Sequence, residues 1–540
     1  MTMETFDYVI VGAGSAGCVL AYRLAEAGHS VCVLEAGPYD WNPYIHIPAG
    51  IMKTITNRSI TWQLSLSGTD NIKGREIPTV QGRVVGGSGS INGMVYSRGQ
   101  RCDYDNWAHL GAEGWDYEAV LPYFRKVERY LADADPRYRG QQGRMPIGPI
   151  SRQDAISDAF IKGAIETGSK PNADYNGGEQ EGVGYTQATI ARGMRWSSAR
   201  AYLHPARRRF GIKVLTRAVV SRVLFEGRRA VGVEFSREGS DTLHVVRARA
   251  ETILCAGTAH TPKLLQLSGV GPAALLNGHG IPVLFDLPGV GRNLSDHFAA
   301  RIVMRARDNV RTINSLARGL PLAGEIVKWM AGRPSIVSMC SMAVYMFGKV
   351  SPSSEYNDYA VTFTPASLKA GATRKLDAFP GVTSGAWQLR PQSRGYVAIR
   401  SSHHRDNPII APNYLDAEND RLTLVAGIKR SHAILRSAAM AHIVDSQILP
   451  EQPCRTDDEW LDYIRQYGMT GYHLVGTCRM GGSDDPGTVV DSRLRVRGIE
   501  GLRVIDASVM PTTPSANTNA ATTMIAEKGS EMVLADRAIA

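Results

Sequence analysis

A histidine and an asparagine near the C-terminal end of this 540-residue chain have the side chains best suited to chemistry. His473 lies in Tyr472-His473-Leu-Val-Gly476-Thr477, and Asn517 lies in a stretch rich in Ser, Asn and Thr. Histidine is the usual general base near neutral pH, and an asparagine amide N–H can stabilise negative charge on an oxygen. The separation of 44 residues says only that the two come from different elements, and any one of the 13 histidines is most often a structural hydrogen-bonding residue. Asn517 could equally be an ordinary turn residue.

A glycine-rich turn near the N-terminus is suited to binding a dinucleotide. The turn, Gly12-Ala-Gly14-Ser15-Ala-Gly17, follows a β-rich run at 6–11 and precedes helix formers at 18–27 and a second strand at 30–35. Gly12 would make the tight turn, Gly14 would admit a pyrophosphate, and Gly17 would let the helix pack on the strand. The helix N-terminus would face the phosphates, and Glu35 would accept hydrogen bonds from a ribose.

Small residues are dense again over 82–93, which includes Gly86-Gly87-Ser88-Gly89-Ser90. Such density is expected where the backbone approaches a ligand closely. A flexible linker is the alternative, but linkers do not carry residues such as Val85, Ile91 and Met94.

The composition excludes several classes of protein. Hydrophobic residues make up 43% and charged residues 21%, which is typical of a globular protein and not of a disordered one. The net charge is +10, but the densest basic run is Arg207-Arg208-Arg209 and has no aromatic stripe beside it, so we expect no nucleic acid partner. A basic surface could still favour peripheral association with an anionic membrane, or an acidic redox partner.

The seven cysteines and the N-terminus argue against a secreted or metal-stabilised protein. The cysteines form no CxxC motif or Cys/His cluster, so we expect neither a disulfide framework nor a metal site. The N-terminus has no basic region of the signal-peptide type, and no apolar run reaches the length of a membrane span. These features predict a cytoplasmic protein.

The remaining pattern predicts the elements that must position these residues. Residues 39–80 lack clear periodicity and are predicted to form an extended segment outside the main elements. Residues 115–131 are predicted to form a helix with Asp116 as its N-cap. Four strands are expected at 212–216, 219–225, 230–235 and 250–256, and short strands at 358–363 and 395–400. Helices are expected at 261–276 (Pro262 first, and broken at 268–272), 312–332, 417–441 and 522–537.

Four ordered segments together resemble the signatures of the glucose-methanol-choline (GMC) flavoprotein oxidoreductases. They are the N-terminal strand–turn–helix–strand unit, residues 82–105, residues 257–271, and the C-terminal pair 472–481 and 506–520. The resemblance extends over nearly the whole chain and is weakest over 301–390. It implies an α/β fold in which a Rossmann-like FAD-binding domain (1–300 and 463–540) accompanies a second, α+β substrate-binding domain (301–462).

The resemblance also assigns roles to residues. His473 and Asn517 match the family's catalytic positions. The FAD contacts would come from Gly12, Gly14, Ser15, Gly17, Glu35, Ala36, Ser88, Asn92, Gly93, Met94, Val95, Val220, Asp506, Ala507 and Thr518. Ile91 stands where some members carry the histidine that bonds covalently to FAD, so a non-covalent FAD is expected. Gly89 and Ala521 depart from the usual Ser and Pro of the family.

The resemblance implies oxidation of a primary alcohol, which we expect to be apolar or aromatic, by hydride transfer to flavin N5 with His473 as the base. The electrons would then pass to oxygen, a quinone or a redox protein. Sugar or polyol oxidation, a non-redox lyase on the same scaffold, a nicotinamide-dependent dehydrogenase and a flavin-binding protein without turnover are the alternatives.

The roles of some side chains can be interpreted in two ways. Met339, Met342, Tyr345, Met346 and Phe347 could line a substrate pocket or form the buried face of a helix. We expect His260 and His297 to be structural hydrogen-bonding residues, and His403-His404 to form an exposed turn instead of a metal pair.

Overall fold

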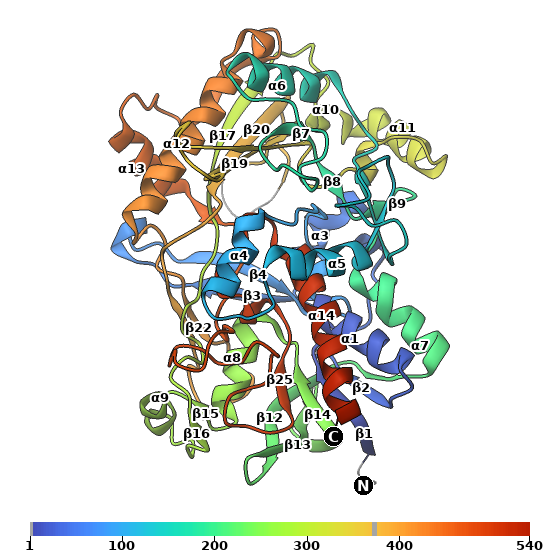
Figure 1. The fold of residues 1–540 in the computed structure, drawn as a ribbon. Helices are drawn as coiled ribbons and strands as arrows, with labels where there is room; N and C mark the ends of the chain where they lie inside the picture. Colours follow the sequence, from blue (N-terminus) through green and yellow to red (C-terminus); the bar gives the residue numbers. More distant parts are fainter. Residues whose placement is uncertain (1–3, 370–374, 540) are drawn as a thin grey trace.

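The computed structural model describes residues 4–369 and 375–539. Two seven-stranded sheets lie one above the other along the long axis of the molecule, and both chain ends lie at the lower end (Figure 1). The lower part combines most of residues 4–300 with the C-terminal segment, whereas residues from about 300 to 470 form most of the upper part (Figure 1).

The lower sheet is built on the predicted strand–turn–helix–strand unit. Its strand order is β11-β2-β1-β14-β13-β12, with β25 paired to β14. The strands are β1 (Glu4–Val11), β2 (Val31–Leu34), β11 (Lys213–Leu215), β12 (Ala218–Glu226), β13 (Arg229–Arg237), β14 (Leu243–Leu254) and β25 (Leu502–Val504). Helices α1 (Ser15–Glu26) and α14 (Thr518–Ile539) pack against each other beside it. The parallel β11-β2-β1-β14 core, connected through α1, confirms the Rossmann-like prediction.

The upper sheet is largely antiparallel and takes strands from three parts of the chain. Its order is β23-β17-β20-β19-β18-β7, with β24 paired to β17. The strands are β7 (Gly182–Tyr185), β17 (Phe298–Ala306), β18 (Val344–Gly348), β19 (Tyr359–Thr364), β20 (Gly381–Gln388), β23 (Val444–Leu449) and β24 (Met469–Thr470). Because β7 and β24 come from the segments 1–300 and 463–540, the sheet extends beyond the predicted second domain 301–462.

Helices cover the upper sheet and connect the two parts. Helix α12 (Glu418–Leu435) packs on β17, β19 and β20, and α6 (Ala155–Glu166) packs on β7, β18 and β19. The other elements are α2 (Pro43–His46), α3 (Ile51–Thr54), α4 (Arg101–His109), α5 (Tyr117–Val127), β5 (Glu128–Tyr130), β6 (Met145–Pro149), β8 (Gln187–Ala188), β9 (Ile190–Ala191), β10 (Met194–Arg195), α7 (His204–Phe210), α8 (Gly257–Leu267), β15 (Val270–Gly271), α9 (Ala273–Gly278), β16 (Phe285–Asp286), α10 (Ile313–Leu316), α11 (Gly319–Met330), β21 (Tyr396–Ala398), β22 (Ile409–Ala411) and α13 (Asp457–Tyr467).

Two predictions about local structure were wrong. Residues 39–80 contain a hairpin of β3 (Thr61–Leu66) and β4 (Ile77–Gly82), which the prolines and weak periodicity obscured. The run at 344–348 is strand β18, so the spacing of its large residues does not mark a helix face. By contrast, Asp116 caps α5 as predicted, since its carboxylate accepts a hydrogen bond from the Ala119 N–H at 3.1 Å.

Pro262 lies inside α8 and not at its first position, which corrects the predicted start at 261. Proline lacks an N–H, so the carbonyl four residues earlier loses its helical partner. That carbonyl belongs to Thr258, and it accepts a hydrogen bond from the Thr477 hydroxyl at 2.7 Å. A contact from the C-terminal motif therefore compensates for the proline.

Two searches of residues 4–369 and 375–539 gave negative results. No helix there is both long enough and apolar enough to cross a bilayer. No group of three or more His, Cys, Asp or Glu side chains in the same residues could hold a metal ion.

Candidate active site

The glycines of the N-terminal turn leave room for a ligand and for close backbone packing. Gly12 has a φ of +101°, and a Cβ there would lie 2.5 Å from the Cys255 carbonyl oxygen. A Cβ at Gly17 would lie only 1.9 Å from the Gly12 carbonyl oxygen. At Gly14 the nearest atom is the Cys255 oxygen at 3.8 Å, so this glycine has free space in front of it. Gly12 and Gly17 are therefore needed by the fold, while Gly14 is open toward a cavity.

A cavity of about 520 Å³ runs from this turn to the C-terminal motifs. Its walls include every residue that the sequence assigned to FAD except Gly17, which packs behind the turn. They are Gly12, Gly14, Ser15, Glu35, Ala36, Ser88, Asn92, Gly93, Met94, Val95, Val220, Asp506, Ala507 and Thr518. Glycines, the N-terminus of α1 and a ribose-binding carboxylate at one end of an elongated cavity fit a dinucleotide.

Glu35 ends β2 at the far end of this cavity. Its two carboxylate oxygens accept hydrogen bonds from the N–H groups of Ala13 and Gly37, both at 2.9 Å. Burial raises the pKa of Glu35 to about 7, and these hydrogen bonds oppose the rise. Each oxygen keeps a further lone pair, which could accept a ribose hydroxyl.

The segment 88–95 is held by a buried arginine that sequence reasoning missed. The Arg195 guanidinium donates to the Asn92 side-chain oxygen at 2.7 Å and to the Gly89 carbonyl at 3.3 Å. Gly89, one of the two departures from the family pattern, lies beside Ser15: a Cβ at Gly89 would be 3.2 Å from the Ser15 hydroxyl. Ala521, the other departure, is fully buried in α14.

His473 and Asn517 meet at the other end of the cavity, although 44 residues separate them. The His473 Nε2 and Asn517 Nδ2 atoms are 3.0 Å apart, and both residues line the cavity. Asn517 directly precedes α14, while His473 follows Tyr472, whose φ of +62° marks a sharp backbone turn. The fold therefore brings the two predicted catalytic residues together.

A second histidine determines which nitrogen of His473 is free to accept a proton. The His297 Nε2 atom lies 2.9 Å from the Leu389 carbonyl oxygen, which can only accept, so His297 carries its proton on Nε2. The His297 Nδ1 atom is then an acceptor, and it lies 2.9 Å from the His473 Nδ1. His473 must therefore be protonated at Nδ1, which leaves the Nε2 lone pair facing Asn517 and the cavity.

Sequence reasoning expected His297 to be a structural hydrogen-bonding residue, and it missed this positioning role. It also missed the neighbouring Asp296, whose carboxylate accepts hydrogen bonds from the His473 backbone N–H at 2.7 Å and the Thr470 hydroxyl at 2.6 Å. The Tyr414 hydroxyl donates to the same carboxylate. In the sequence, the only indication that Asp296 and His297 belong to the site is that they follow the glycine-rich stretch at 289–291.

Burial keeps both histidines neutral at pH 7. Desolvation lowers the pKa of His473 well below its ordinary 6.5, and the neighbouring His297 lowers it further. Burial lowers the pKa of His297 itself to about 4. A neutral imidazole is the form that accepts a proton, so His473 is in its basic form throughout the physiological range.

The cavity that holds this pair has many apolar wall residues, and the Trp387 ring lies 6.2 Å from the His473 ring. They include Ile51, Ile55, Trp62, Met94, Val95, Ala299, Met342, Trp387 and Met469. Of the five residues considered from the 339–347 stretch, Met342 lines the cavity. Tyr345 contacts the site from behind, since its hydroxyl lies 3.4 Å from the Asn517 side-chain oxygen.

The other singled-out histidines have different surroundings. His260 lines the cavity beside Trp62, with a ring separation of 4.6 Å, and burial lowers its pKa to about 3. His403 is exposed, and the His404 ring lies 3.1 Å from the Ser236 hydroxyl. His403 fits the predicted exposed turn, whereas His404 is half-buried and also lines the cavity.

Comparisons with known proteins agree with this geometry. Profiles of the GMC oxidoreductase family match residues 6–299 and 391–526. An alcohol dehydrogenase (acceptor) of Pseudomonas putida is 39% identical over 535 residues, covering 98% of this chain and 96% of the relative. An oxygen-dependent choline dehydrogenase of Brucella ovis is 37% identical over 529 residues, covering 98% and 95%.

Solved structures show the same fold. Pyridoxine 4-oxidase from Mesorbium loti has a TM-score of 0.86 at 29% identity, covering 97% of this chain and 98% of that one. A formate oxidase of Aspergillus oryzae, solved in a study of FAD modification, has a TM-score of 0.91 at 25% identity over the full length of both chains. The chain belongs to the GMC oxidoreductase family. It is an FAD-dependent oxidoreductase acting on CH–OH donors, which confirms the predicted family, fold class and cofactor.

Proposed function

We propose that this GMC oxidoreductase oxidises an uncharged, apolar primary alcohol to the aldehyde, with His473 as the general base. The observation that carries this proposal is the apolar wall of the cavity around His473 and Asn517. Trp62, Trp387 and Met342 would bury an alkyl or aryl group there, and burial of apolar surface is favourable by roughly 25 cal/mol per Å².

The charges of the cavity argue against a cationic alcohol such as choline. Among the described residues that line it, Glu35 and Asp506 are the only carboxylates, and Glu35 lies in the dinucleotide end. The Asp506 carboxylate already accepts hydrogen bonds from the Gly257 N–H at 2.8 Å and the Thr261 hydroxyl at 2.6 Å on one oxygen alone. A buried quaternary ammonium would therefore have no free carboxylate, and an unpaired buried charge is costly.

The geometry of His473 and Asn517 supports a specific proton transfer. An alcohol oxygen within reach of both side chains would donate its proton to the His473 Nε2 lone pair and accept a hydrogen bond from the Asn517 amide. The His297 acceptor holds the His473 Nδ1 proton and prevents the ring from presenting an N–H to the substrate. Bound FAD supplies the hydride acceptor.

We further propose that FAD is held without a covalent bond. The side chain at the family's attachment position is Ile91, which lines the cavity and has no nucleophilic atom. Acid denaturation followed by centrifugation tests this point, because non-covalent flavin stays in the supernatant. Yellow colour in the protein pellet would contradict it.

An anaerobic panel of alcohols tests the proposed substrate class. Bleaching of the flavin is followed with a medium-chain primary alcohol, benzyl alcohol, choline and glucose. We expect kcat/KM for the apolar alcohols to exceed that for choline and glucose by roughly 10²-fold or more, since the latter would bury unpaired polar groups. Faster reduction by choline or glucose would overturn the proposal, and no reduction by any alcohol would favour a non-redox lyase. Reoxidation by air or by a quinone analogue then identifies the electron acceptor.

A further inference from the structure

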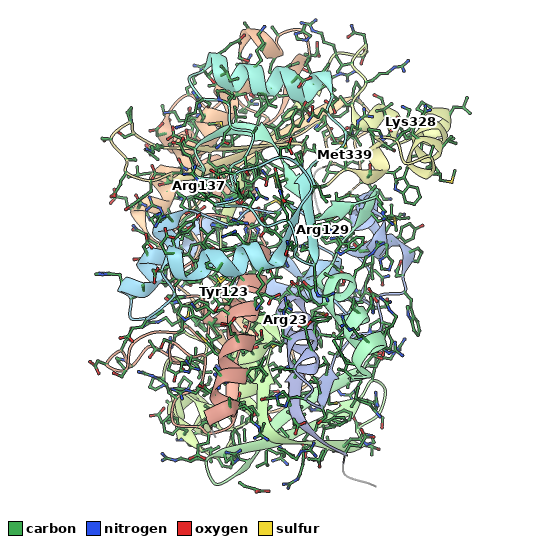
Figure 2. The ribbon with its side chains drawn as sticks, turned by 45° about the vertical axis from the view of Figure 1, so that its right-hand side comes forward. Arg23, Tyr123, Arg129, Arg137, Lys328 and Met339 are labelled. Atoms are coloured by element: carbon green, nitrogen blue, oxygen red, sulfur yellow. The ribbon has the colours of Figure 1, made fainter. Side chains whose placement is uncertain are left out.

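Helix α11 exposes an unusual set of apolar side chains. Leu320 is 88% exposed, Met330 68%, Val327 60% and Ile326 39%. The helix projects from the upper part of the molecule at its edge (Figure 1). Figure 2 shows Lys328 on this helix at the periphery, with Met339 nearer to the body of the protein. Clusters of large exposed apolar residues mark interaction surfaces in soluble proteins.

Among the described residues of this helix, Glu325 is the one that is fully buried, and it is an acid. Glu325 is 2% exposed, and its carboxylate accepts a hydrogen bond from the Ile336 N–H at 2.9 Å. The Trp329 indole N–H donates to the Gly193 carbonyl at 2.8 Å. Leu322 and Trp329 also pack, partly buried, against the hydrophobic core. Polar and apolar contacts therefore both anchor α11, and the apolar side chains that remain exposed are those that a surface helix ordinarily does not show to solvent.

Positive charges surround the exposed apolar face. Arg311, Arg318, Lys328 and Arg333 are all exposed on α11 or next to it. The one acid between residues 311 and 333 is the buried Glu325, which is paired with Lys328 at 2.6 Å. An apolar helix face bordered by basic side chains is complementary to an anionic bilayer surface.

This surface lies beside a wall of the substrate cavity. The short helical turn Ile336–Ser338 follows α11 and contacts the turn Pro48–Gly50, which leads directly into α3. Ile51 at the start of α3 lines the cavity, and so does Ser341, which is exposed to solvent. A residue of the cavity wall therefore lies eleven residues after the end of α11.

We propose that α11 docks on the surface of an anionic lipid bilayer, so that the mouth of the cavity faces the membrane and an apolar alcohol enters from the lipid. The proposed docking does not depend on the proposed function, whereas the delivery of the alcohol from the lipid rests on it. A second copy of the chain is a poorer occupant, because a symmetric contact would bring two sets of like charges together.

Vesicle co-sedimentation of the flavin-loaded enzyme tests the docking. The probes are vesicles of phosphatidylcholine alone and vesicles with about one third phosphatidylglycerol, at low and high salt. The triple variant Leu320→Ser/Val327→Asn/Met330→Gln removes the apolar face. Its matched control is Leu131→Ser/Leu243→Asn/Leu422→Gln, whose exposed leucines lie on separate elements. We expect the first variant to lose at least about tenfold in vesicle affinity, and the control to bind like the wild type.

A charge variant separates specific docking from general basicity. Arg311→Gln/Arg333→Gln should lower affinity for anionic vesicles about fivefold per charge, whereas Arg208→Gln/Arg209→Gln on α7 should leave it nearly unchanged. Failure of the wild type to bind anionic vesicles, or equal losses in test and control variants, would overturn the proposal. So would a concentration-dependent dimer that the α11 substitutions dissociate.

Activity measurements distinguish docking from the proposed reaction. The α11 variants should oxidise a short, water-soluble alcohol at the wild-type rate, because their substituted side chains are outside the cavity. They should oxidise a long-chain alcohol dissolved in vesicles at least about fivefold more slowly. Vesicle binding without any alcohol oxidation would support docking and reject the proposed function. Alcohol oxidation without vesicle binding would support the proposed function and reject the docking.

Discussion

The two ends of the cavity are built in different ways. The dinucleotide end is centred on one local unit, in which Gly12 and Gly14 lie between β1 and α1 and Gly17 lies in the first turn of α1. The catalytic end comes from residues far apart in the chain, since His473 touches both His297 and Asn517. Binding at the first end depends on the space that the glycines leave beside the backbone. Chemistry at the second end depends on the protonation and orientation of the His473 imidazole.

Because of this difference, we expect substitutions at the two ends to impair the protein in different ways. A substitution in the glycine turn should affect folding or cofactor content, because the backbone there has no alternative arrangement. A substitution at the catalytic end should leave FAD in place and slow the chemistry, because the side chains there project from elements that are packed elsewhere. Flavin content and the rate of flavin reduction therefore separate the two ends experimentally.

The largest effect is expected for Gly17→Val. Its Cβ would lie 1.9 Å from the Gly12 carbonyl oxygen, so the helix cannot keep its position against the strand. Overpacking of this kind costs about 1–3 kcal/mol or more, and we expect little folded, flavin-loaded protein. Thermal unfolding and the ratio of flavin to protein absorbance measure the outcome.

Gly14→Ala is the matched variant for this experiment. Its Cβ would meet no protein atom closer than 3.8 Å, so the apoprotein should unfold at the wild-type temperature. The methyl group would instead occupy the space reserved for the pyrophosphate, and flavin content should fall sharply. If the two variants had the same stability and the same flavin content, Gly17 would not be distinguished from Gly14 by a role in packing, nor Gly14 from Gly17 by a role in leaving space for the ligand.

The next largest effect is expected for His473→Ala. Removal of a general base costs roughly 10²–10⁴-fold, so anaerobic flavin reduction at saturating alcohol should slow by about that factor. Flavin content should not change. A variant that reduces within a few-fold of the wild type would show that His473 is not the base.

The pH dependence of the same rate has a defined sign. The neutral imidazole is active, so wild-type reduction should be lost as pH falls through the pKa of His473 and be constant above it. Burial and His297 lower that pKa, so this loss should occur below the ordinary 6.5 of histidine. In His473→Ala the deficit should shrink at high pH, where hydroxide substitutes for the missing base.

A smaller loss is expected for Asn517→Ala. Loss of one donor to a developing oxyanion typically costs 10²–10³-fold, with FAD content near normal. Tyr345→Phe is a useful comparison, because it removes only the 3.4 Å contact to the Asn517 side-chain oxygen and should cost a few-fold at most. Loss of FAD from Asn517→Ala would mean that the residue is structural.

A loss smaller than that of Asn517→Ala is expected for His297→Ala. The His473 Nδ1 proton loses its acceptor, and loss of such an orienting partner costs roughly 10–100-fold. The loss of activity on acidification should also move to higher pH, because His297 is one of the causes that lower the pKa of His473. His297→Gln, whose side-chain oxygen can accept the proton, should restore part of the rate. An unchanged pH profile would argue against a positioning role.

Much of the lower sheet could be predicted from the sequence, and much of the upper sheet could not. The strands at 219–225 and 230–235 are rich in valine and phenylalanine and are separated by a turn at Gly227, so their hairpin is a local property. Strand β7 carries no comparable signal, because it pairs with β18, more than 150 residues away. Such pairings depend on which sheet edge the rest of the fold leaves open.

The sequence by itself determined the dinucleotide turn and the acid that follows β2, and it predicted His473 and Asn517 as site residues through the family resemblance, because each belongs to a short motif. Only the tertiary structure decided that His297 would hold the His473 Nδ1 proton and that Thr477 would compensate for Pro262. Local motifs are readable because the backbone conformation of a few residues is restricted by their own side chains. Contacts between distant side chains have no such restriction, and they form only when two sheets and their connections are packed together.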